Sequence, residues 1–425
     1  MTEAARSPSQ TISTTCCIAG GGPGGVMLGL LLARAGVKVV VLEKHADFLR
    51  DFRGDTIHPS TLTVMEELGL LEELLSRPHN KIRRLQVTVG RTTLTVANFS
   101  FLPDHRAFVA MMPQWHFLDF LAGHARRYPN FQLLMQADVT DIIEEGGRVA
   151  GVLATTPEGP LKVTADLVVG ADGRHSIVRQ KAGLKIEDVG APIDVFWMRI
   201  SRAAGDPGTG GRVDAGSFFA MLDRGDYWQL AYVIPKGAAE PNRAAGLPAF
   251  REIIANALPF LTNRVSELKT WDDVQLLTVR IDRLRKWCRP GLLCIGDAAH
   301  AMSPIGGVGI NLAIQDAVAA ANLLWRPLEE GALTEDDLAR VQRRREFPMR
   351  VTQRFQVLAQ NRIIQPVLST TAPTLSPPWA LRLLDQITWL QQIPARFIGI
   401  GVRPEHVRSP DTHPYHHEPE KVSEA

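Results

Sequence analysis

Residues 16–29 have the sequence CCIAGGGPGGVMLG, and the interpretation of the whole chain starts from them. An apolar stretch, a glycine-rich turn and a second apolar stretch predict a strand, a tight turn and a helix. Gly20, Gly22 and Gly25 have the spacing G-x-G-x-x-G. In such a unit the glycines make the turn, let a pyrophosphate approach the backbone and allow helix and strand to pack closely. The N–H groups that begin the helix favour phosphate binding.

The residues after this turn support a dinucleotide site. A predicted helix over residues 24–35 ends at Gly36, and residues 37–42, VKVVVL, are typical of a buried parallel strand. Glu43 ends this strand about 20 residues after the glycines, where a carboxylate can accept the hydroxyls of an adenosine ribose. The alternative is a βαβ unit that binds no nucleotide.

Length and composition indicate a globular protein with two lobes. The chain has 425 residues, of which 45% are hydrophobic and 22% charged. Its 47 basic and 45 acidic residues create no overall field that would favour nucleic acid or an anionic membrane as a partner. The polar residues 1–13 lack the pattern of a signal peptide, and no apolar run is long enough for a transmembrane segment. We therefore expect a cytoplasmic protein.

The four cysteines fit no metal site and no disulfide framework. Cys16 and Cys17 are adjacent in a predicted buried strand, and Cys288 and Cys294 lie at a later strand. We expect all four to be core residues and no metal to be bound.

Two further strands end in a carboxylate beside glycine. A helix over residues 60–75, a hairpin around Gly90, a helix over residues 115–128 and a meander of short strands over residues 131–164 lead to DLVVGADG, which ends at Asp172 and Gly173. Later, GLLCIGDAAH ends a strand near Asp297, and a glycine loop and a helix over residues 312–324 follow it. Open α/β sheets bind ligands at the carboxyl ends of their strands.

Between these two motifs the pattern changes to aromatic-rich strands without helices. Residues 195–200, 217–222 and 227–234 predict a second, antiparallel lobe, followed by a helical segment over residues 242–268. After the second motif we expect helices over residues 335–347 and 379–400. The last is amphipathic, and we expect it to pack on the core rather than on a membrane surface.

The glycine turn with Glu43, the Asp172–Gly173 motif and the Asp297 motif stand in one order along the chain. Together they resemble the FAD-dependent aromatic hydroxylase family, the single-component flavoprotein monooxygenases of the p-hydroxybenzoate hydroxylase and ubiquinone-biosynthesis hydroxylase type. The resemblance covers residues 14–340. It implies FAD as cofactor, NADH or NADPH as transient reductant, and molecular oxygen as co-substrate.

The resemblance also assigns residues. It implies that Asp172 and Gly173 serve both FAD and the nicotinamide cofactor, that Asp297 binds the ribityl chain, and that residues 306–311 face the isoalloxazine ring. The cofactor-binding residues would be Gly20, Gly22, Gly25, Glu43, Lys44, Arg53, Gln114, Val139, Asp172, Gly173, Asp297, Pro304, Gly307, Gly309 and Asn311. The chemistry would run through a flavin hydroperoxide, so no catalytic triad is needed. Candidates for a catalytic contribution are Arg53, His58 and Pro304; for His58 the alternative is a surface position in its loop.

The substrate would be an aromatic or polycyclic small molecule held between the flavin and the antiparallel lobe. Its pocket candidates are Phe196, Trp197, Arg199, Tyr227, Trp228 and Gly306. Because strand side chains alternate, either Trp197 with Arg199 or Phe196 with Met198 faces inward.

The predicted fold is α/β, with a Rossmann-like FAD-binding domain, an interleaved antiparallel-sheet substrate domain and a helical C-terminal region. The FAD-binding domain would take residues 14–83, 113–185 and 276–345. The substrate lobe would take a hairpin from residues 84–112 and the sheet of residues 186–275. C-terminal helices would occupy residues 346–407, before a disordered tail over residues 408–425.

Two other functions remain open within this pattern, and the sequence argues against a third. A flavin-dependent halogenase carries Trp-x-Trp-x-Ile-Pro, whereas residues 230–235 here are LAYVIP and lack both tryptophans. An FAD-dependent reductase or dehydrogenase without oxygen insertion would share the motifs. So would a non-catalytic flavin-binding redox sensor. The sequence leaves open the substrate, the regiochemistry, the choice between NADH and NADPH, and the oligomeric state.

Overall fold

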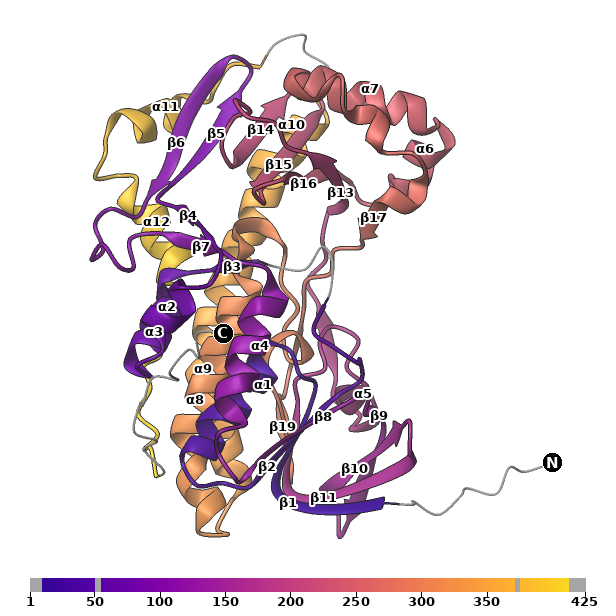
Figure 1. Cartoon of the computed structure of the whole chain (residues 1–425), viewed down its shortest axis with the longest axis vertical. Coiled ribbons are helices and arrows are strands. Elements are labelled where there is room, and N and C mark those ends of the chain that lie inside the picture. The colour runs from indigo at the N-terminus through magenta and orange to yellow at the C-terminus, as the bar shows by residue number, and fades with distance from the viewer. Residues whose placement is uncertain (1–9, 50–54, 371–374, 413–425) are drawn as a thin grey trace, which may run out of the picture.

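The computed structural model describes residues 10–49, 55–370 and 375–412. It contains two lobes, each built on its own large β-sheet (Figure 1). The lower lobe in Figure 1 combines its sheet with long helices, and the upper lobe carries the second sheet. This arrangement confirms the predicted α/β class.

The sheet of the lower lobe has a parallel centre in the order β20-β11-β1-β2-β8. β1 pairs in parallel with both β11 and β2, so the carboxyl ends of these strands meet at one edge. β19 adds an antiparallel edge, and β9 and β10 form a meander against β11. The strands are β1 (Gln10–Ala19), β2 (Val39–Glu43), β8 (Phe131–Met135), β9 (Asp138–Glu145), β10 (Arg148–Thr156), β11 (Gly159–Gly170), β19 (Cys288–Arg289) and β20 (Leu292–Cys294).

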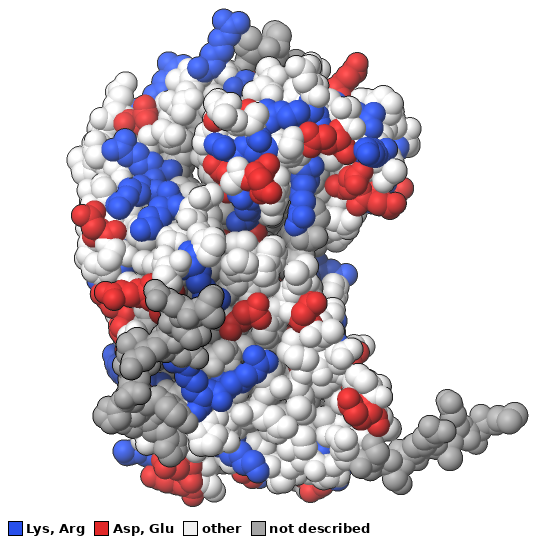
Figure 2. Space-filling view, in the orientation of Figure 1, with Lys and Arg blue, Asp and Glu red and all other residues white. Residues whose placement is uncertain are grey.

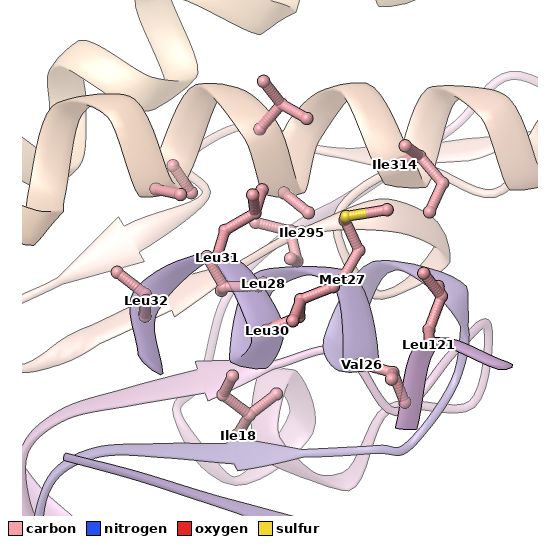
Figure 3. Close-up of a cluster of buried hydrophobic side chains, with 14 of the residues drawn as sticks. Ile18, Val26, Met27, Leu28, Leu30, Leu31, Leu32, Leu121, Ile295 and Ile314 are labelled. Carbon is pink, nitrogen blue, oxygen red and sulfur yellow. The ribbon is translucent and has the colours of Figure 1, made fainter. Parts of the chain in front are cut away.

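In the part of the chain that the structure describes, six helices contribute to the core on one face of this sheet. Figure 3 shows the apolar side chains of α1 between Ile18 of the sheet and Ile314 of α8. Residues that point to the other face of the sheet pack in a second core with β9, β10 and α5 (Ile177–Lys181). The six helices are α1 (Pro23–Arg34), α2 (Pro59–Glu67), α3 (Leu71–Leu75), α4 (Gln114–Ala125), α8 (Gly309–Glu329) and α9 (Glu335–Ala359).

The adjacent cysteines lie in the buried C-terminal half of β1, over residues 16–19. Cys16 and Cys17 are both fully buried, and they belong to the cores on opposite faces of the sheet. Burial raises the pKa of Cys17 to about 12. Cys288 and Cys294 are buried as well, and none of the four forms a disulfide. All four are core residues, as predicted.

The upper lobe contains a seven-stranded sheet in the order β17-β13-β16-β15-β14-β5-β6. Its two ends come from distant parts of the chain, because β5 of the early hairpin pairs in parallel with β14. Helices α6 (Ala239–Ala244) and α7 (Leu247–Ala257) cover one face. The strands are β5 (Arg84–Val89), β6 (Thr92–Asn98), β13 (Ile193–Ser201), β14 (Gly210–Asp214), β15 (Ser217–Asp223), β16 (Tyr227–Pro235) and β17 (Val274–Leu277).

Two small sheets lie outside these layers. One has the order β3-β7-β4 and the other pairs β12 with β18. β7 therefore belongs with β3 and β4, and not with the β5–β6 hairpin whose predicted segment included it. The strands are β3 (Thr56–Ile57), β4 (Asn80–Ile82), β7 (Val109–Met111), β12 (Ile186–Asp188) and β18 (Asp282–Leu284).

Three predicted helical segments are interrupted in the structure. Residues 60–75 form α2 (Pro59–Glu67) and α3 (Leu71–Leu75), because Gly69 between them has φ +72°. In residues 242–268, α7 ends before Pro259, which disfavours helix at the residue preceding it. Residues 379–400 form α11 (Trp379–Gln386) and α12 (Gln392–Gly399), and Gln391 between them donates from Nε2 to the carbonyl of Asp385.

The C-terminal helices cover the lobes less fully than predicted. α10 (Gln365–Leu368) and α11 have no buried residue, and Trp379 is 77% exposed. Among the described residues, one helical stretch, Ile305–Glu329, is long and apolar enough to cross a membrane, and 67% of its apolar window is buried inside the protein. Its helix α8 packs between α1 and α9, as a core helix does.

Charges of both signs are interspersed over the surface. On the face shown in Figure 2, Lys, Arg, Asp and Glu side chains occur on both lobes. This distribution agrees with the near balance of 47 basic and 45 acidic residues.

Candidate active site

The glycine turn has the geometry that its spacing predicts. Gly20 has φ +107°, and a Cβ there would lie 2.4 Å from the carbonyl oxygen of Ala171. A Cβ on Gly25 would lie 2.0 Å from the carbonyl oxygen of Gly20. No heavy atom lies within 4 Å of a Cβ built on Gly22, which is the N-cap of α1 and gives it no side-chain cap. The turn is therefore tight on both sides and open at the helix N-terminus, where a pyrophosphate would bind.

Glu43 lies directly beside this turn at the end of β2. Its Oε2 accepts the N–H of Gly21 at 2.9 Å, and its Oε1 accepts the N–H of His45 at 3.1 Å. The carboxylate is thus fixed at the edge of the sheet where a ribose would lie. Lys44 beside it is exposed, whereas Val139 is buried in the core on the β9–β10 side. The side chain of Val139 is therefore not free to contact a cofactor.

Asp172 presents one unpaired oxygen at the end of β11. Its Oδ2 accepts the N–H of Val178 at 3.2 Å, at the start of α5. Its Oδ1 is buried and has no hydrogen-bond partner. Burial raises the pKa of this carboxyl group above its ordinary value. Gly173 follows with φ +84°, which turns the chain sharply behind the carboxylate.

Asp297 stands at the end of the neighbouring strand, β20, in a short 3-10 turn. Its side chain is half-buried, and among the described residues it makes no hydrogen bond or ion pair. The turn is fixed by Gly296, whose N–H donates to Oδ2 of Asp316 at 3.1 Å. Asp172 and Asp297 thus bring acceptor oxygens to one edge of the sheet. These acceptors fit the hydroxyl groups of FAD, which can donate hydrogen bonds to them.

The glycine loop after Asp297 forms the entrance to α8. Gly306 and Gly307 have φ +79° and +62°, and Gly306 is exposed. Thr56 Oγ1 donates to the carbonyl of Gly307 at 2.8 Å, which ties the loop to β3. Gly309 begins α8 and leaves open space around the position of a Cβ. Pro304 precedes the loop and is half-buried. The loop therefore offers backbone groups, and few side chains, to a flat ring.

Asn311 holds this loop in place. Its Oδ1 accepts the N–H of His58 at 2.9 Å and the hydroxyl of Thr61 at 2.7 Å. Its Nδ2 donates to the carbonyl of Thr56 at 3.1 Å. Because these protein groups occupy both ends of the amide, the side chain acts as a positioning group for the loop.

His58 is buried, so the alternative of a surface position is wrong. The side chain is 1% exposed, and its Nδ1 lies 2.8 Å from the carbonyl oxygen of Ile398. Burial lowers the pKa of this histidine to about 4, so the ring is neutral at physiological pH. The ring joins α2 to α12 and is enclosed by protein, which does not suit a group that exchanges protons with a substrate. Arg53, the other polar candidate of this segment, lies outside the described residues.

A buried polar cluster between the two lobes was missed by the motif analysis. Asp55 pairs with Arg224 of the β15–β16 turn, and Arg224 Nε donates to Gln229 Oε1 at 3.0 Å. Asp55 Oδ1 also accepts the N–H of Gln114, the first residue of α4, at 3.1 Å. Burial raises the pKa of Asp55 to about 6 against the opposing effect of Arg224. The only sequence signal for Asp55 was the irregular sequence before β3, which is typical of a functional loop. Arg224 belongs to none of the motifs, so their pairing could not be predicted.

The antiparallel sheet divides the predicted pocket residues between its two faces. Phe196 and Trp228 are fully buried against α7 and the segment after it, so their assignment to a pocket is wrong. Trp197 points to the opposite face, where its cluster also includes Ile305 of the glycine loop. Arg199 and Tyr227 share that face, with the guanidinium 4.8 Å from the ring centroid. Phe196 and Met198 therefore face α7, whereas Trp197 and Arg199 share the face on which Ile305 packs.

A second buried network is joined to the Asp297 turn through the bond from Gly296 to Asp316. Asp316 is fully buried and lies 2.6 Å from His300 Nε2 and 2.9 Å from Arg345 Nε. Burial alone would raise the pKa of Asp316, but the charges and hydrogen bonds of His300 and Arg345 lower it below its ordinary value. This network joins β20, α8 and α9. Its members are far apart in sequence, so motif analysis did not find it.

Comparison with known proteins agrees with this geometry. A family described as FAD binding domain matches residues 13–355. The chain is 35% identical over 370 residues to the 6-methylpretetramide 4-monooxygenase of Streptomyces rimosus, covering 84% of this chain and 86% of that protein. It is 26% identical over 350 residues to the para-nitrophenol 4-monooxygenase of a Pseudomonas species, covering 78% and 82%.

The fold is also shared with solved structures. The p-nitrophenol 4-monooxygenase of Pseudomonas putida superimposes with a TM-score of 0.72 at 21% identity, over 91% of this chain and 97% of that one. At this identity the similarity concerns the fold alone. The family match covers most of the chain and includes all three strand-end motifs. The chain therefore belongs to the FAD binding domain family and is an FAD-dependent aromatic monooxygenase.

Proposed function

We propose that this enzyme uses NADH or NADPH to hydroxylate a polycyclic aromatic small molecule that binds between the glycine loop and the antiparallel sheet. The observation that carries the proposal is the contact between the two lobes. Ile305 of the loop packs against the face of the sheet that presents Trp197. An aromatic wall beside a loop of backbone groups suits a flat substrate next to a flat ring.

The chain's own residues would orient the cofactor in three places. The N-terminus of α1 would hold the pyrophosphate, Glu43 the adenosine ribose, and Asp297 the ribityl hydroxyls. Bound FAD would supply the redox chemistry, accepting electrons from the nicotinamide and activating oxygen. The protein would hold the ring against residues 305–309 and exclude water from it. No side chain of the described site needs to act as a nucleophile.

A group of cations supports a phosphate-bearing reductant near Asp172. Burial and four neighbouring cations lower the pKa of His175, and these neighbours include Arg280, Arg174 and Lys44. Lys44 and Arg280 are exposed, and both act electrostatically on His175, two residues after Gly173. Positive charge at this place would attract the phosphates of NADH or NADPH. The cytoplasm, where these reductants are available, is the proposed location.

The substrate class follows from the relative at 35% identity. 6-Methylpretetramide, the compound in that relative's name, is the first compound to test. The test measures NADH and NADPH oxidation, oxygen uptake and product mass, using the FAD-loaded protein with and without this compound. We expect oxidation to accelerate when the aromatic compound is present, and the product to gain one oxygen atom.

The same measurements separate the alternatives. Nicotinamide oxidation and substrate conversion without a gain of oxygen would indicate a reductase or dehydrogenase. A halogenated product formed only with added halide would indicate a halogenase. A yellow protein that oxidises neither nicotinamide with any aromatic compound would indicate a redox sensor. A protein that binds no FAD would contradict the proposal as a whole.

A further inference from the structure

Three buried hydrogen-bond donors near the glycine loop have no acceptor. They are Arg224 Nη1, Gln229 Nε2 and the indole Nε1 of Trp197. Almost all buried polar atoms in proteins are paired, and an unpaired buried donor is destabilising. Three such donors in one region therefore indicate that a ligand group is bound there.

The register of the sheet brings these donors together. Trp197 lies opposite Ala231, and Arg199 lies opposite Gln229, so Trp197 and Gln229 share one face as diagonal neighbours. Arg224 is joined to Gln229 by the hydrogen bond from its Nε to Oε1. All three donors thus belong to one region on the side of the sheet opposite α7.

This region also adjoins the proposed position of the flavin ring. The cluster around Trp197 includes Ile305. Asp55, the partner of Arg224, is followed directly by Thr56, whose hydroxyl donates to the carbonyl of Gly307. The donors therefore lie on the substrate side of residues 305–307, and both lobes contribute to their position.

Asp55 satisfies only some of the hydrogen-bond donors of the Arg224 guanidinium. It pairs with Arg224 Nη2, and Gln229 Oε1 accepts from Nε, which leaves Nη1 without a partner. The amide of Gln229 is oriented by that same bond, so its NH₂ group is left as a free donor. The three remaining groups can donate hydrogen bonds but cannot accept them.

We infer that Arg224, Gln229 and Trp197 form a subsite for an acceptor oxygen of the aromatic substrate, either a carbonyl or an ionised hydroxyl group. This inference rests on the proposed function. A neutral hydroxyl suits the subsite less well, because the site offers no acceptor for its proton. The subsite selects for oxygenated rings over plain hydrocarbons, since an unoxygenated ring leaves all three donors unpaired.

The test measures binding, without NADH or NADPH, by quenching of tryptophan fluorescence and by the change in flavin absorbance. The probes are 1-tetralone, which offers a carbonyl, 4-nitrophenol at alkaline pH, which offers a phenolate, and naphthalene, which offers neither. We expect at least one oxygenated probe to bind the FAD-loaded enzyme more than tenfold more tightly than naphthalene. Which of the two does so identifies the source of the oxygen. Equal affinity for all three probes would overturn the inference.

Two variants locate the effect. Gln229→Glu keeps an oxygen for Arg224 Nε but replaces the free donor with an acceptor, and Trp197→Phe removes the indole N–H while keeping an aromatic ring. We expect each to weaken binding of the preferred oxygenated probe about tenfold or more and to leave naphthalene binding unchanged. Gln132→Glu, at an exposed position of β8 in the other sheet, is the matched control and should bind like the unaltered enzyme.

The outcomes separate this inference from the proposed function. Unchanged probe affinity in both folded variants would overturn the subsite even if the enzyme hydroxylates its substrate. Lower FAD content with unchanged probe affinity would also overturn it, because the donors would then face the cofactor. Selective loss of oxygenated probes in an enzyme that inserts no oxygen would support the subsite and contradict the hydroxylase.

Discussion

Asp297 is the residue whose role depends most directly on the cofactor. Its carboxylate is half-buried and has no partner in the part of the chain that the structure describes. Removing this carboxylate should change the stability of the protein little and weaken FAD binding strongly. We expect Asp297→Ala to lose bound FAD, with a drop in affinity of about tenfold to a hundredfold for a charge-assisted hydrogen bond. Flavin absorbance of the purified variant measures this loss.

The control for Asp297 is Asp166→Asn, which changes an exposed carboxylate in β11. It should retain the FAD content of the unaltered protein. Normal flavin content in Asp297→Ala would contradict the assignment of this residue to the ribityl chain.

His58 gives the protein a dependence on pH that no surface histidine would give. Its pKa is about 4 when folded, and about 6.5 is ordinary for an unfolded chain. The unfolded chain therefore takes up the proton first as pH falls. Above about pH 6.5 the neutral, buried ring contributes fully to the free energy of unfolding. This contribution is lost as pH falls from about 6.5 to 4, and the total loss is at most about 3 kcal/mol.

We therefore expect His58→Gln to have a flatter pH dependence of unfolding between about pH 4 and 6.5 than the unaltered protein. Urea unfolding at several pH values measures it. His105→Gln, at an exposed ion pair with Glu66, should keep the original slope. An unchanged slope in the His58 variant would show that another group titrates in this range.

Single residues were predictable where they belong to a local motif. The glycines of residues 20–25, Glu43, Asp172 and Asp297 are each fixed by the strand that they follow, so spacing alone was enough to place them at one edge. Asn311 was recognised as part of the loop, but its bonds to residues 56–61 could not be anticipated because they join distant segments. The same reason hid the partnership of Asp55 with Arg224.

At the scale of elements, the turn between β1 and α1 tolerates no side chain at Gly25. A Cβ there would meet the backbone oxygen of Gly20 at 2.0 Å, and a backbone atom cannot move aside as a side chain can. We expect Gly25→Ala to destabilise the protein by about 1–3 kcal/mol and to lower FAD binding, because α1 must shift from the strand. Thermal unfolding and flavin content measure the two effects.

Gly123→Ala is the matched control for this prediction. Gly123 lies in α4 at an exposed position, and nothing lies within 4 Å of a Cβ built there. Alanine is the better helix former, so this variant should gain about 0.5–1 kcal/mol. A Gly25 variant as stable and as yellow as the Gly123 variant would contradict the tight-turn interpretation.

Elements with strong local signals were predicted well, and their boundaries less well. The apolar pattern of β1, α1 and β2 identified all three, because residues 16–19, 24–33 and 39–42 of these elements are buried. The breaks within residues 60–75 and 379–400 coincide with one glycine of positive φ and with one glutamine side chain that bonds to the backbone. Neither changes the hydrophobic period that the prediction used.

At the scale of the whole molecule, FAD should act as a stabilising ligand. Its proposed contacts come from residues 20–43, 172–173 and 297–309, so it would join three separate parts of the chain. A ligand at about 100 times its Kd adds about 2.7 kcal/mol to stability. We expect removal of FAD to lower the Tm by about 3–5 °C. Differential scanning calorimetry with and without added FAD tests this. An identical Tm in the two forms would indicate that FAD does not bridge these parts.

The two-lobed arrangement was predictable because each lobe has its own pattern, with alternating strands and helices in one and strands alone in the other. The attachment of the early hairpin to the later sheet was anticipated from the family resemblance. Which face of that sheet would meet the flavin could not be predicted, since alternation along β13 is symmetrical. The packing of Ile305 on one face and α7 on the other supports the proposal that it is the face of Trp197.

The parallel pairing of β5 with β14 has a consequence for how the chain acquires its fold. Gly211 pairs with Val87, so this contact forms only after more than a hundred intervening residues have been synthesised and brought back. Contacts this distant in sequence slow folding. Until β14 is available, the edge of β5 in the early hairpin stays unpaired. A ribosome-bound fragment that ends before β14 would therefore expose that edge. Coexpression of a chaperone should raise the soluble yield of such a fragment more than that of the full chain.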